Sequence, residues 1–77
     1  MIKVKDKKYI EEMGFTKNED HDYICRGKAE DGTLVKLFTI YAGSLYIRNA
    51  KAAYTNSLQL KLIYDWTKKD YIEWEED

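Results

Sequence analysis

Two glycine turns divide the middle of the chain into three strand-forming segments. Asp31 and Gly32 lie between residues 23–29 and residues 33–41, and Ala42 with Gly43 leads into residues 44–49. An Asp-Gly pair between alternating apolar segments is a strong hairpin signal, because glycine readily adopts the positive φ of a tight turn. The segment therefore predicts a three-stranded antiparallel β-meander.

Period-two alternation sorts the side chains of this meander onto two faces. The face expected to form the core collects Tyr23, Cys25, Ala29, Leu34, Phe38, Ile40, Leu45 and Ile47. The second face collects Ile24, Arg26, Lys28, Val35, Leu37, Thr39, Tyr41, Tyr46 and Arg48. This assignment assumes two-residue turns, and a type I turn with a G1 bulge at Gly32 would shift the first strand by one residue.

The N-terminal part predicts a short strand followed by a short helix. Residues 2–4 alternate apolar and basic side chains, as a strand does. Asp6 is a favourable N-cap for a helix over residues 7–13, and Gly14 is a favourable left-handed stop. Residues 16–22 are polar and are expected to form a loop.

Leu58, Leu62 and Trp66 recur every four residues in the C-terminal third. This spacing favours a helix over residues 57–69, although the apolar residues also alternate as they would in a strand. The helix is the expectation, because leucine, glutamine and lysine are good helix formers.

Asn56 or Ser57 would cap this helix, with Gln59 in the capping-box position. Residues 71–74 would follow as a short closing strand beside the N-terminal one. The predicted order is (β)αβββα(β) in a single small domain over residues 1–77. The fold class is α+β, with a three-stranded antiparallel meander packed against two helices.

The composition indicates a protein of the cytoplasm. The chain has 77 residues, and Cys25 is its single cysteine, so no intrachain disulfide can form. Secreted domains of this size usually need such bridges. No apolar run approaches the roughly 18 residues of a membrane span, and the first residues lack a signal-peptide core. We expect a cytoplasmic protein without a membrane partner.

Catalytic and metal motifs are not recognisable. Cys25 and His21 would be separated by about 13 Å along an extended strand, beyond hydrogen-bond reach. The acidic run of residues 19–22 contains the single histidine, and its spacing matches no EF-hand or zinc site. The glycines form no phosphate-binding motif. We therefore expect a non-enzymatic protein with no metal and no cofactor.

The second face of the meander is a candidate nucleic-acid surface. It combines basic and aromatic side chains, which contact phosphates and stack on bases: Arg26, Lys28, Tyr41, Tyr46 and Arg48. The αβββα order resembles the double-stranded-RNA-binding domain in order only, because residues 54–57 lack the basic cluster of that family. The alternative is that a helix covers the apolar members of this face.

The acidic, aromatic C-terminus is a candidate protein-binding surface. Tyr71 would be an aromatic anchor among the carboxylates of Glu73, Glu75 and Glu76, which suit a basic partner. The alternative is a strand that packs Ile72 and Trp74 inward and ends in a solubilising tail.

Composition and layout carry one further resemblance. Lysine strongly outnumbers arginine and proline is absent, as AT-rich codons favour, and the layout runs from a helix through Gly14 and Phe15 into the meander. In these respects the chain is similar to small accessory proteins of phages and prophages of low-GC Gram-positive bacteria. The resemblance implies a protein that binds and blocks a host or phage protein, including defence nucleases. Nucleic-acid binding is the alternative function, and self-association is a third.

Overall fold

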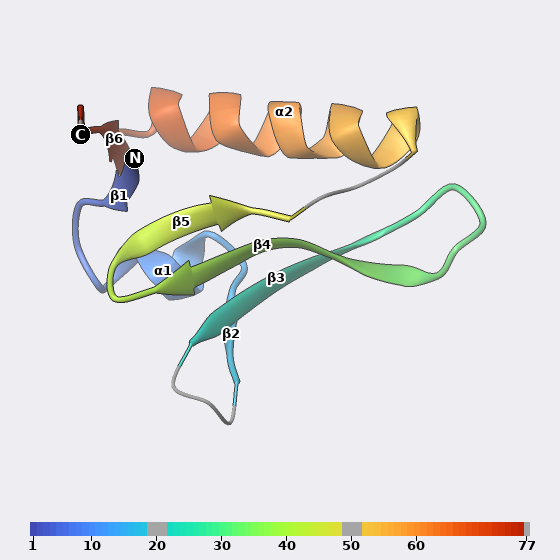
Figure 1. The fold of residues 1–77 in the computed structure, drawn as a ribbon, viewed down its shortest axis with the longest axis horizontal. Coiled ribbons are helices and arrows are strands. Elements are labelled where there is room, and N and C mark those ends of the chain that lie inside the picture. Colours follow the sequence, from blue (N-terminus) through green and yellow to red (C-terminus); the bar gives the residue numbers. More distant parts are fainter. Residues whose placement is uncertain (19–21, 49–51, 77) are drawn as a thin grey trace.

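The computed structural model describes residues 1–18, 22–48 and 52–76, which form an α+β fold. The strands are β1 (Ile2–Val4), β2 (Thr16–Lys17), β3 (Tyr23–Lys28), β4 (Leu34–Tyr41), β5 (Ser44–Ile47) and β6 (Ile72–Trp74). The helices are α1 (Tyr9–Glu12) and α2 (Ala53–Lys68). The described strands form one antiparallel sheet of order β2-β3-β4-β5-β1-β6 (Figure 1). The α+β class is thus confirmed, and the sheet is larger than the predicted three-stranded meander.

The sheet extends beyond both ends of the meander, and the predicted closing strand beside the N-terminal strand is confirmed. β1 pairs with β5 on one side and with β6 on the other, so the two ends of the chain lie side by side (Figure 1). At the opposite edge, Thr16 and Lys17 pair with Ile24 and Tyr23. The prediction of a loop over residues 16–22 is therefore wrong at its start. The buried ring of the preceding Phe15 anchors this segment beside β3.

Three aromatic rings from distant parts of the chain form the centre of the core. Phe38 on β4 has no solvent-exposed surface, and its ring lies 4.9 Å from that of Trp66 on α2 and 6.5 Å from that of Phe15. The Phe15 and Trp66 rings are 5.7 Å apart. Because Phe15 follows α1 directly, these contacts place both helices on the Phe38 side of the sheet. We call the opposite side the open face.

The turn between β3 and β4 contains a G1 bulge at Gly32, which is the alternative to the expected two-residue turn. The Gly32 N–H donates to the Ala29 carbonyl at 2.9 Å, the Ala29 N–H donates to the Thr33 carbonyl at 2.8 Å, and Gly32 has φ +88°. The Asp31 carboxylate accepts hydrogen bonds from both the N–H and the hydroxyl of Thr33. The expected two-residue turn is therefore wrong, and pairing near the turn is shifted by one residue.

A second bulge at Leu37 cancels this shift. Arg26 pairs with Lys36 and Cys25 pairs with Phe38, which leaves Leu37 without a partner. Leu37 and Phe38 are consequently both buried, although they are adjacent in the strand. The predicted register is confirmed from Cys25 toward Tyr23 and is wrong between the two bulges.

The side chains between the bulges change faces accordingly. Leu37 was expected on the second face but is buried, and Leu34 was expected in the core but is 65% exposed. Val35 packs against the core cluster. Ile47, also expected in the core, ends β5 and is half-exposed.

Helix α2 is confirmed against the strand alternative, but it begins earlier than predicted. Its N-cap is Ala52, which provides no side-chain hydrogen bond, so the predicted caps at Asn56 and Ser57 are wrong. Leu58, Leu62 and Trp66 face the core as predicted. Within the described residues, neither helix is long and apolar enough to cross a membrane.

Helix α1 is shorter than predicted. It covers Tyr9–Glu12, and the Asp6 carboxylate accepts a hydrogen bond of 3.0 Å from the Lys8 N–H just before it. Gly14, with φ +89°, ends the helical segment as predicted. The chain then turns directly into Phe15, which closes the core.

Candidate functional site

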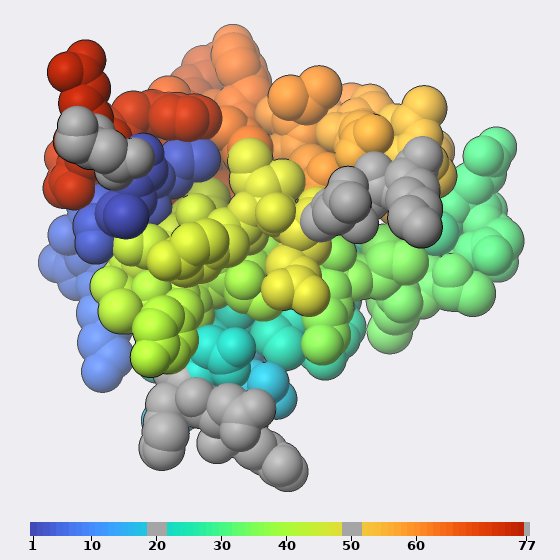
Figure 2. Space-filling view, viewed as in Figure 1, coloured from blue at the N-terminus to red at the C-terminus, as the bar shows by residue number. Residues whose placement is uncertain are grey.

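The open face carries two rows of paired side chains across the sheet. Ile24, Thr39 and Tyr46 form one row, because Thr39 pairs with both of the other two. Arg26 and Lys36 form the next row toward the β3–β4 turn. Figure 2 shows β4 and β5 at the surface of the molecule, with neither helix in front of them. The face therefore presents side chains to solvent rather than to a second layer.

A groove of about 720 Å³ lies on β4 and β5. Its lining includes Lys36, Thr39 and Tyr46 of the open face and Arg48, which follows β5. It also includes Val35 and Ile47, which the register places on the Phe38 side of the sheet. Tyr46 is 47% exposed, so its ring is accessible from this side, and Lys36 and Arg48 are exposed. An accessible aromatic ring thus lies in one groove with two cations.

The charge of this face contrasts with the net charge of the chain, which is −1. Arg26, Lys28, Lys36 and Arg48 are all exposed. Among the described residues, the ion pairs join Lys5 to Asp70 and Lys69 to Asp65, away from this face. No described carboxylate therefore neutralises these four cations, and they remain available to an anionic partner.

All five residues predicted for nucleic-acid binding lie on the open face and are exposed: Arg26, Lys28, Tyr41, Tyr46 and Arg48. Tyr41 pairs with Ser44 and is a diagonal neighbour of Tyr46, within reach of a long side chain. The alternative of a covering helix is correct for Val35 and Leu37, which the bulge turns to the helix-bearing side of the sheet. Ile24 is buried outside the core cluster.

Lys36 belongs to this surface but was not predicted. Strict alternation from Phe38 would place it on the core face, and the bulge at Leu37 turns it outward to pair with Arg26. The available signal was the G1 bulge at Gly32, which already indicated an irregular register.

The residues proposed at the acidic C-terminus do not form one surface. Tyr71 is partly buried and stacks on Tyr9, with ring centroids 4.5 Å apart and an angle of 19° between the rings. Desolvation, followed by a hydrogen bond to Glu12, raises the pKa of Tyr71 above its ordinary value. Glu73, Glu75 and Glu76 are exposed on and after β6. Tyr71 is thus a packing residue, while the carboxylates face solvent.

The alternative prediction for the C-terminus, a strand that packs Ile72 and Trp74 inward, is confirmed only in part by β6. Ile72 packs inward as that alternative expects, with 3% of its surface exposed. Trp74 does not, because it is 63% exposed. β6 is also the last strand of the sheet order, so it pairs on one side only. An exposed indole therefore lies on an edge strand, with Glu73 and Glu75 as its neighbours in the chain.

The remaining candidate groups are the acidic run of residues 19–22 and Cys25. Glu19, Asp20 and His21 of the acidic run lie outside the described residues. Within residues 1–18, 22–48 and 52–76, no three potential metal ligands lie together. Cys25 is a buried free cysteine, and desolvation raises the pKa of its thiol. A thiol in this state is packed as a small apolar group rather than poised as a nucleophile.

No protein-family model, curated protein or solved structure matches this chain. The surfaces of the molecule are therefore the guide to its function. The open face has the most specific chemistry, because it combines an exposed aromatic ring with cations.

Proposed function

We propose that this protein is a non-enzymatic binding module that holds single-stranded nucleic acid on the open face of its sheet. One observation carries the proposal. The exposed ring of Tyr46 shares a groove with Lys36 and Arg48 on a sheet face that neither helix covers. Flat aromatic rings stack on unpaired bases, and flanking cations bind the phosphates between them.

The geometry favours a single strand over a duplex. The cations lie on a sheet rather than on a helix that could enter a major groove. Unpaired bases can lie flat on a sheet surface, as they do on other sheet-based RNA-binding modules. In the row of Ile24, Thr39 and Tyr46, the exposed ring of Tyr46 provides such a surface, with the basic row beside it.

Fluorescence anisotropy with a labelled oligothymidine of about twelve nucleotides tests this proposal. Tyr46→Leu keeps an apolar side chain in the groove but removes the ring, so binding should weaken by the stacking of about one base, roughly 1–3 kcal/mol. Tyr46→Phe keeps the ring and should bind nearly as the wild type does.

Lys61 provides the matched control for charge, because it is exposed on α2, away from the open face. Arg48→Gln should weaken binding to all sequences, whereas Lys61→Gln should leave it unchanged. Equal effects of the two substitutions would contradict a defined site on the open face.

A second candidate function is protein binding at β6, in line with the resemblance to phage accessory proteins. The observation that favours it is the exposed indole of Trp74 on an edge strand, whose neighbours in the chain, Glu73 and Glu75, are exposed carboxylates. Tryptophan is a frequent anchor of protein interfaces, and the carboxylates suit a basic host or phage protein.

An affinity capture from a low-GC Gram-positive lysate, with and without nuclease treatment, separates the two functions. A protein retained by the wild type after nuclease, but lost with Trp74→Ala or with Glu73→Lys and Glu75→Lys, supports the β6 surface. Tyr71→Ala does not discriminate, because the ring of Tyr71 packs on Tyr9. Recovery that depends on nucleic acid and on Arg48 supports the open face.

A further inference from the structure

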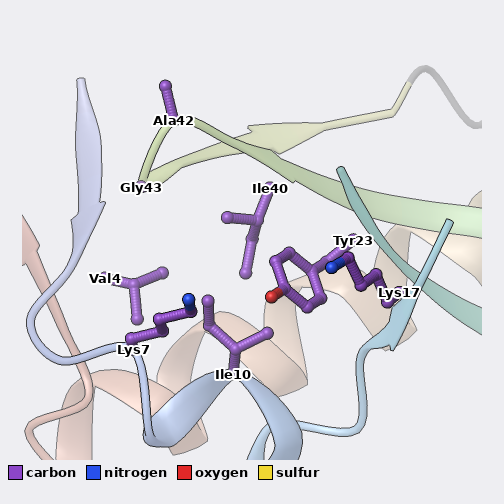
Figure 3. A pocket seen from close by; sticks show the side chains of 8 residues that line it. All are labelled: Val4, Lys7, Ile10, Lys17, Tyr23, Ile40, Ala42 and Gly43. Carbon is purple, nitrogen blue, oxygen red and sulfur yellow. The ribbon is translucent and has the colours of Figure 1, made fainter. Parts of the chain in front are cut away.

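A cavity of about 420 Å³ lies between α1 and the helix-bearing side of the sheet, behind the open face. Figure 3 shows the residues that surround it, which come from β1, the start of the α1 segment, β2, β3, β4 and the β4–β5 turn. The residues that define its chemistry are Val4, Lys7, Ile10, Lys17, Tyr23 and Ile40. None of them contributes to the groove on the open face.

The cavity has an apolar floor and a basic mouth. Ile10 and Ile40 are buried, with 6% and 1% of their surfaces exposed, and Val4 is half-buried beside them. Lys7 and Lys17 are exposed. In Figure 3 the Lys7 amine and the Tyr23 hydroxyl both point into the space above Ile10. Lys17 lies on the other side of the Tyr23 ring, so the two cations flank the opening of an aliphatic cleft, with the Tyr23 hydroxyl between them.

Backbone pairing fixes the walls of the cavity. The Val4 N–H donates to the Gly43 carbonyl at 3.0 Å, and Tyr23 pairs with Ile40 across β3 and β4. The Phe15 N–H donates to the Ile10 carbonyl at 3.3 Å, which ties α1 to the start of β2. Backbone hydrogen bonds and strand pairing, rather than the rotamer of one side chain, therefore fix the walls of the cavity.

The cleft continues into an adjoining cavity of about 470 Å³. The two share Lys7, Ile10, Lys17 and Tyr23, so these residues stand at the centre of the combined space. Among the described residues, Glu11 lines only the adjoining part, and no carboxylate lines the first cavity. An anionic group is consequently favoured at the opening of the first cavity, between Lys7 and Lys17.

We propose that this cavity binds a small amphipathic carboxylate, whose apolar body contacts Val4, Ile10 and Ile40 while its acid group meets Lys7 and the Tyr23 hydroxyl, with Lys17 adding positive charge at the opening. At about 30 Å³ for each water molecule of liquid volume, 420 Å³ corresponds to about fourteen waters. This space suits an acid of medium chain length or a small aromatic acid. Ligand pockets of proteins commonly combine apolar walls with a few polar groups in this way.

Titration of the labelled full chain with decanoate, followed by ¹H–¹⁵N correlation spectra, tests the proposal. Saturable shifts confined to the cavity, around Val4, Ile10, Tyr23 and Ile40, are expected. Decanol has the same apolar body without the charge and should bind severalfold more weakly. A naphthoate titration then shows whether the cavity prefers a straight-chain or an aromatic acid. Equal binding of decanol and decanoate, or shifts spread over the whole molecule, would overturn the proposal.

The variants that test the headgroup site keep the core intact. Lys7→Gln with Lys17→Gln removes two exposed charges and should weaken decanoate binding by roughly threefold to tenfold, the range expected of two exposed ion pairs. Lys61→Gln on α2 should have no effect, and Arg48→Gln on the open face should have none either. Unchanged decanoate affinity in the double variant would overturn the assignment of the headgroup. Because this cavity and the open face share no lining residue, either proposal can fail while the other holds.

Discussion

The side-chain amide of Gln59 on α2 donates a hydrogen bond of 3.0 Å to the backbone carbonyl of Leu37 on β4. The same amide donates a second hydrogen bond, of 2.8 Å, to the carbonyl of Arg48. Leu37 is the unpaired residue of the second bulge, and its carbonyl also accepts from the Arg48 N–H. One buried side chain thus joins the helix, the bulge and the residue that carries a cation of the open face.

Replacement of Gln59 should therefore destabilise the fold. Gln59→Leu keeps the apolar stem but removes both donors, and it should lower the free energy of unfolding by about 1–3 kcal/mol. Urea denaturation measures the change. Ser57→Ala, at an exposed position of the same helix, is the control and should lie within about 0.5 kcal/mol of the wild type. A Gln59→Leu variant as stable as the control would show that these hydrogen bonds contribute nothing net.

Gly27 should not tolerate a side chain, because Leu37 of the bulge lies against it. A Cβ atom at residue 27 would lie 2.5 Å from Leu37 Cδ1 and 3.8 Å from Leu58 Cδ1. Gly27→Ala should cost about 1–3 kcal/mol through overpacking. Leu37→Ala should relieve part of this cost, so a double-mutant cycle measured by urea denaturation should show a favourable coupling between the two substitutions. Strict additivity would contradict the contact.

The turn between β4 and β5 has alanine at a position where asparagine is more favourable. Ala42 and Gly43 have φ +51° and +78°, the pattern of a type I′ turn, which favours Asn-Gly. Ala42→Asn should raise the free energy of unfolding by about 0.5–1 kcal/mol, or several degrees in the midpoint of thermal unfolding for a domain of this size. Gly43→Ala should lower it by about 1 kcal/mol, because alanine is strained at positive φ. The reverse order of stability would exclude this turn type.

The thiol of Cys25 should make stability depend on pH in the alkaline range. Burial raises its pKa, so the folded protein favours the neutral thiol. This contribution is complete below the ordinary thiol pKa and is lost as pH rises through the higher pKa of the folded state. The free energy of unfolding should thus fall more steeply above about pH 9 in the wild type than in Cys25→Ala. Parallel pH profiles would contradict the burial of this thiol.

The sequence predicted those parts of the fold that depend on local pattern. Alternation predicted a core position for Tyr23, Cys25, Phe38 and Ile40. This prediction is confirmed because the two bulges cancel beyond Leu37 and restore the simple register. Helix α2 was also predicted, although its start was not. Its first turn has no capping side chain to mark the beginning.

The parts that were missed depend on contacts between distant residues. The second bulge is accompanied by the close approach of Gly27 and by the hydrogen bond from Gln59, neither of which alternation can reveal. For the same reason Lys36 was not recognised, while Arg26, Tyr46 and Arg48 were. Strand β2, with two residues, is too short to leave a periodic signal and exists through pairing with β3.

The salt dependence of oligothymidine binding tests the central proposal most directly. If Arg26, Lys28, Lys36 and Arg48 all contact phosphates, affinity should fall with a slope of about −3 in log K against log salt concentration. Replacing Lys36 and Arg48 by glutamine should reduce that slope by about half, because two contacts are lost. The same slope in this variant and in the wild type, or no measurable binding at about 50 mM salt, would contradict a nucleic-acid site on the open face.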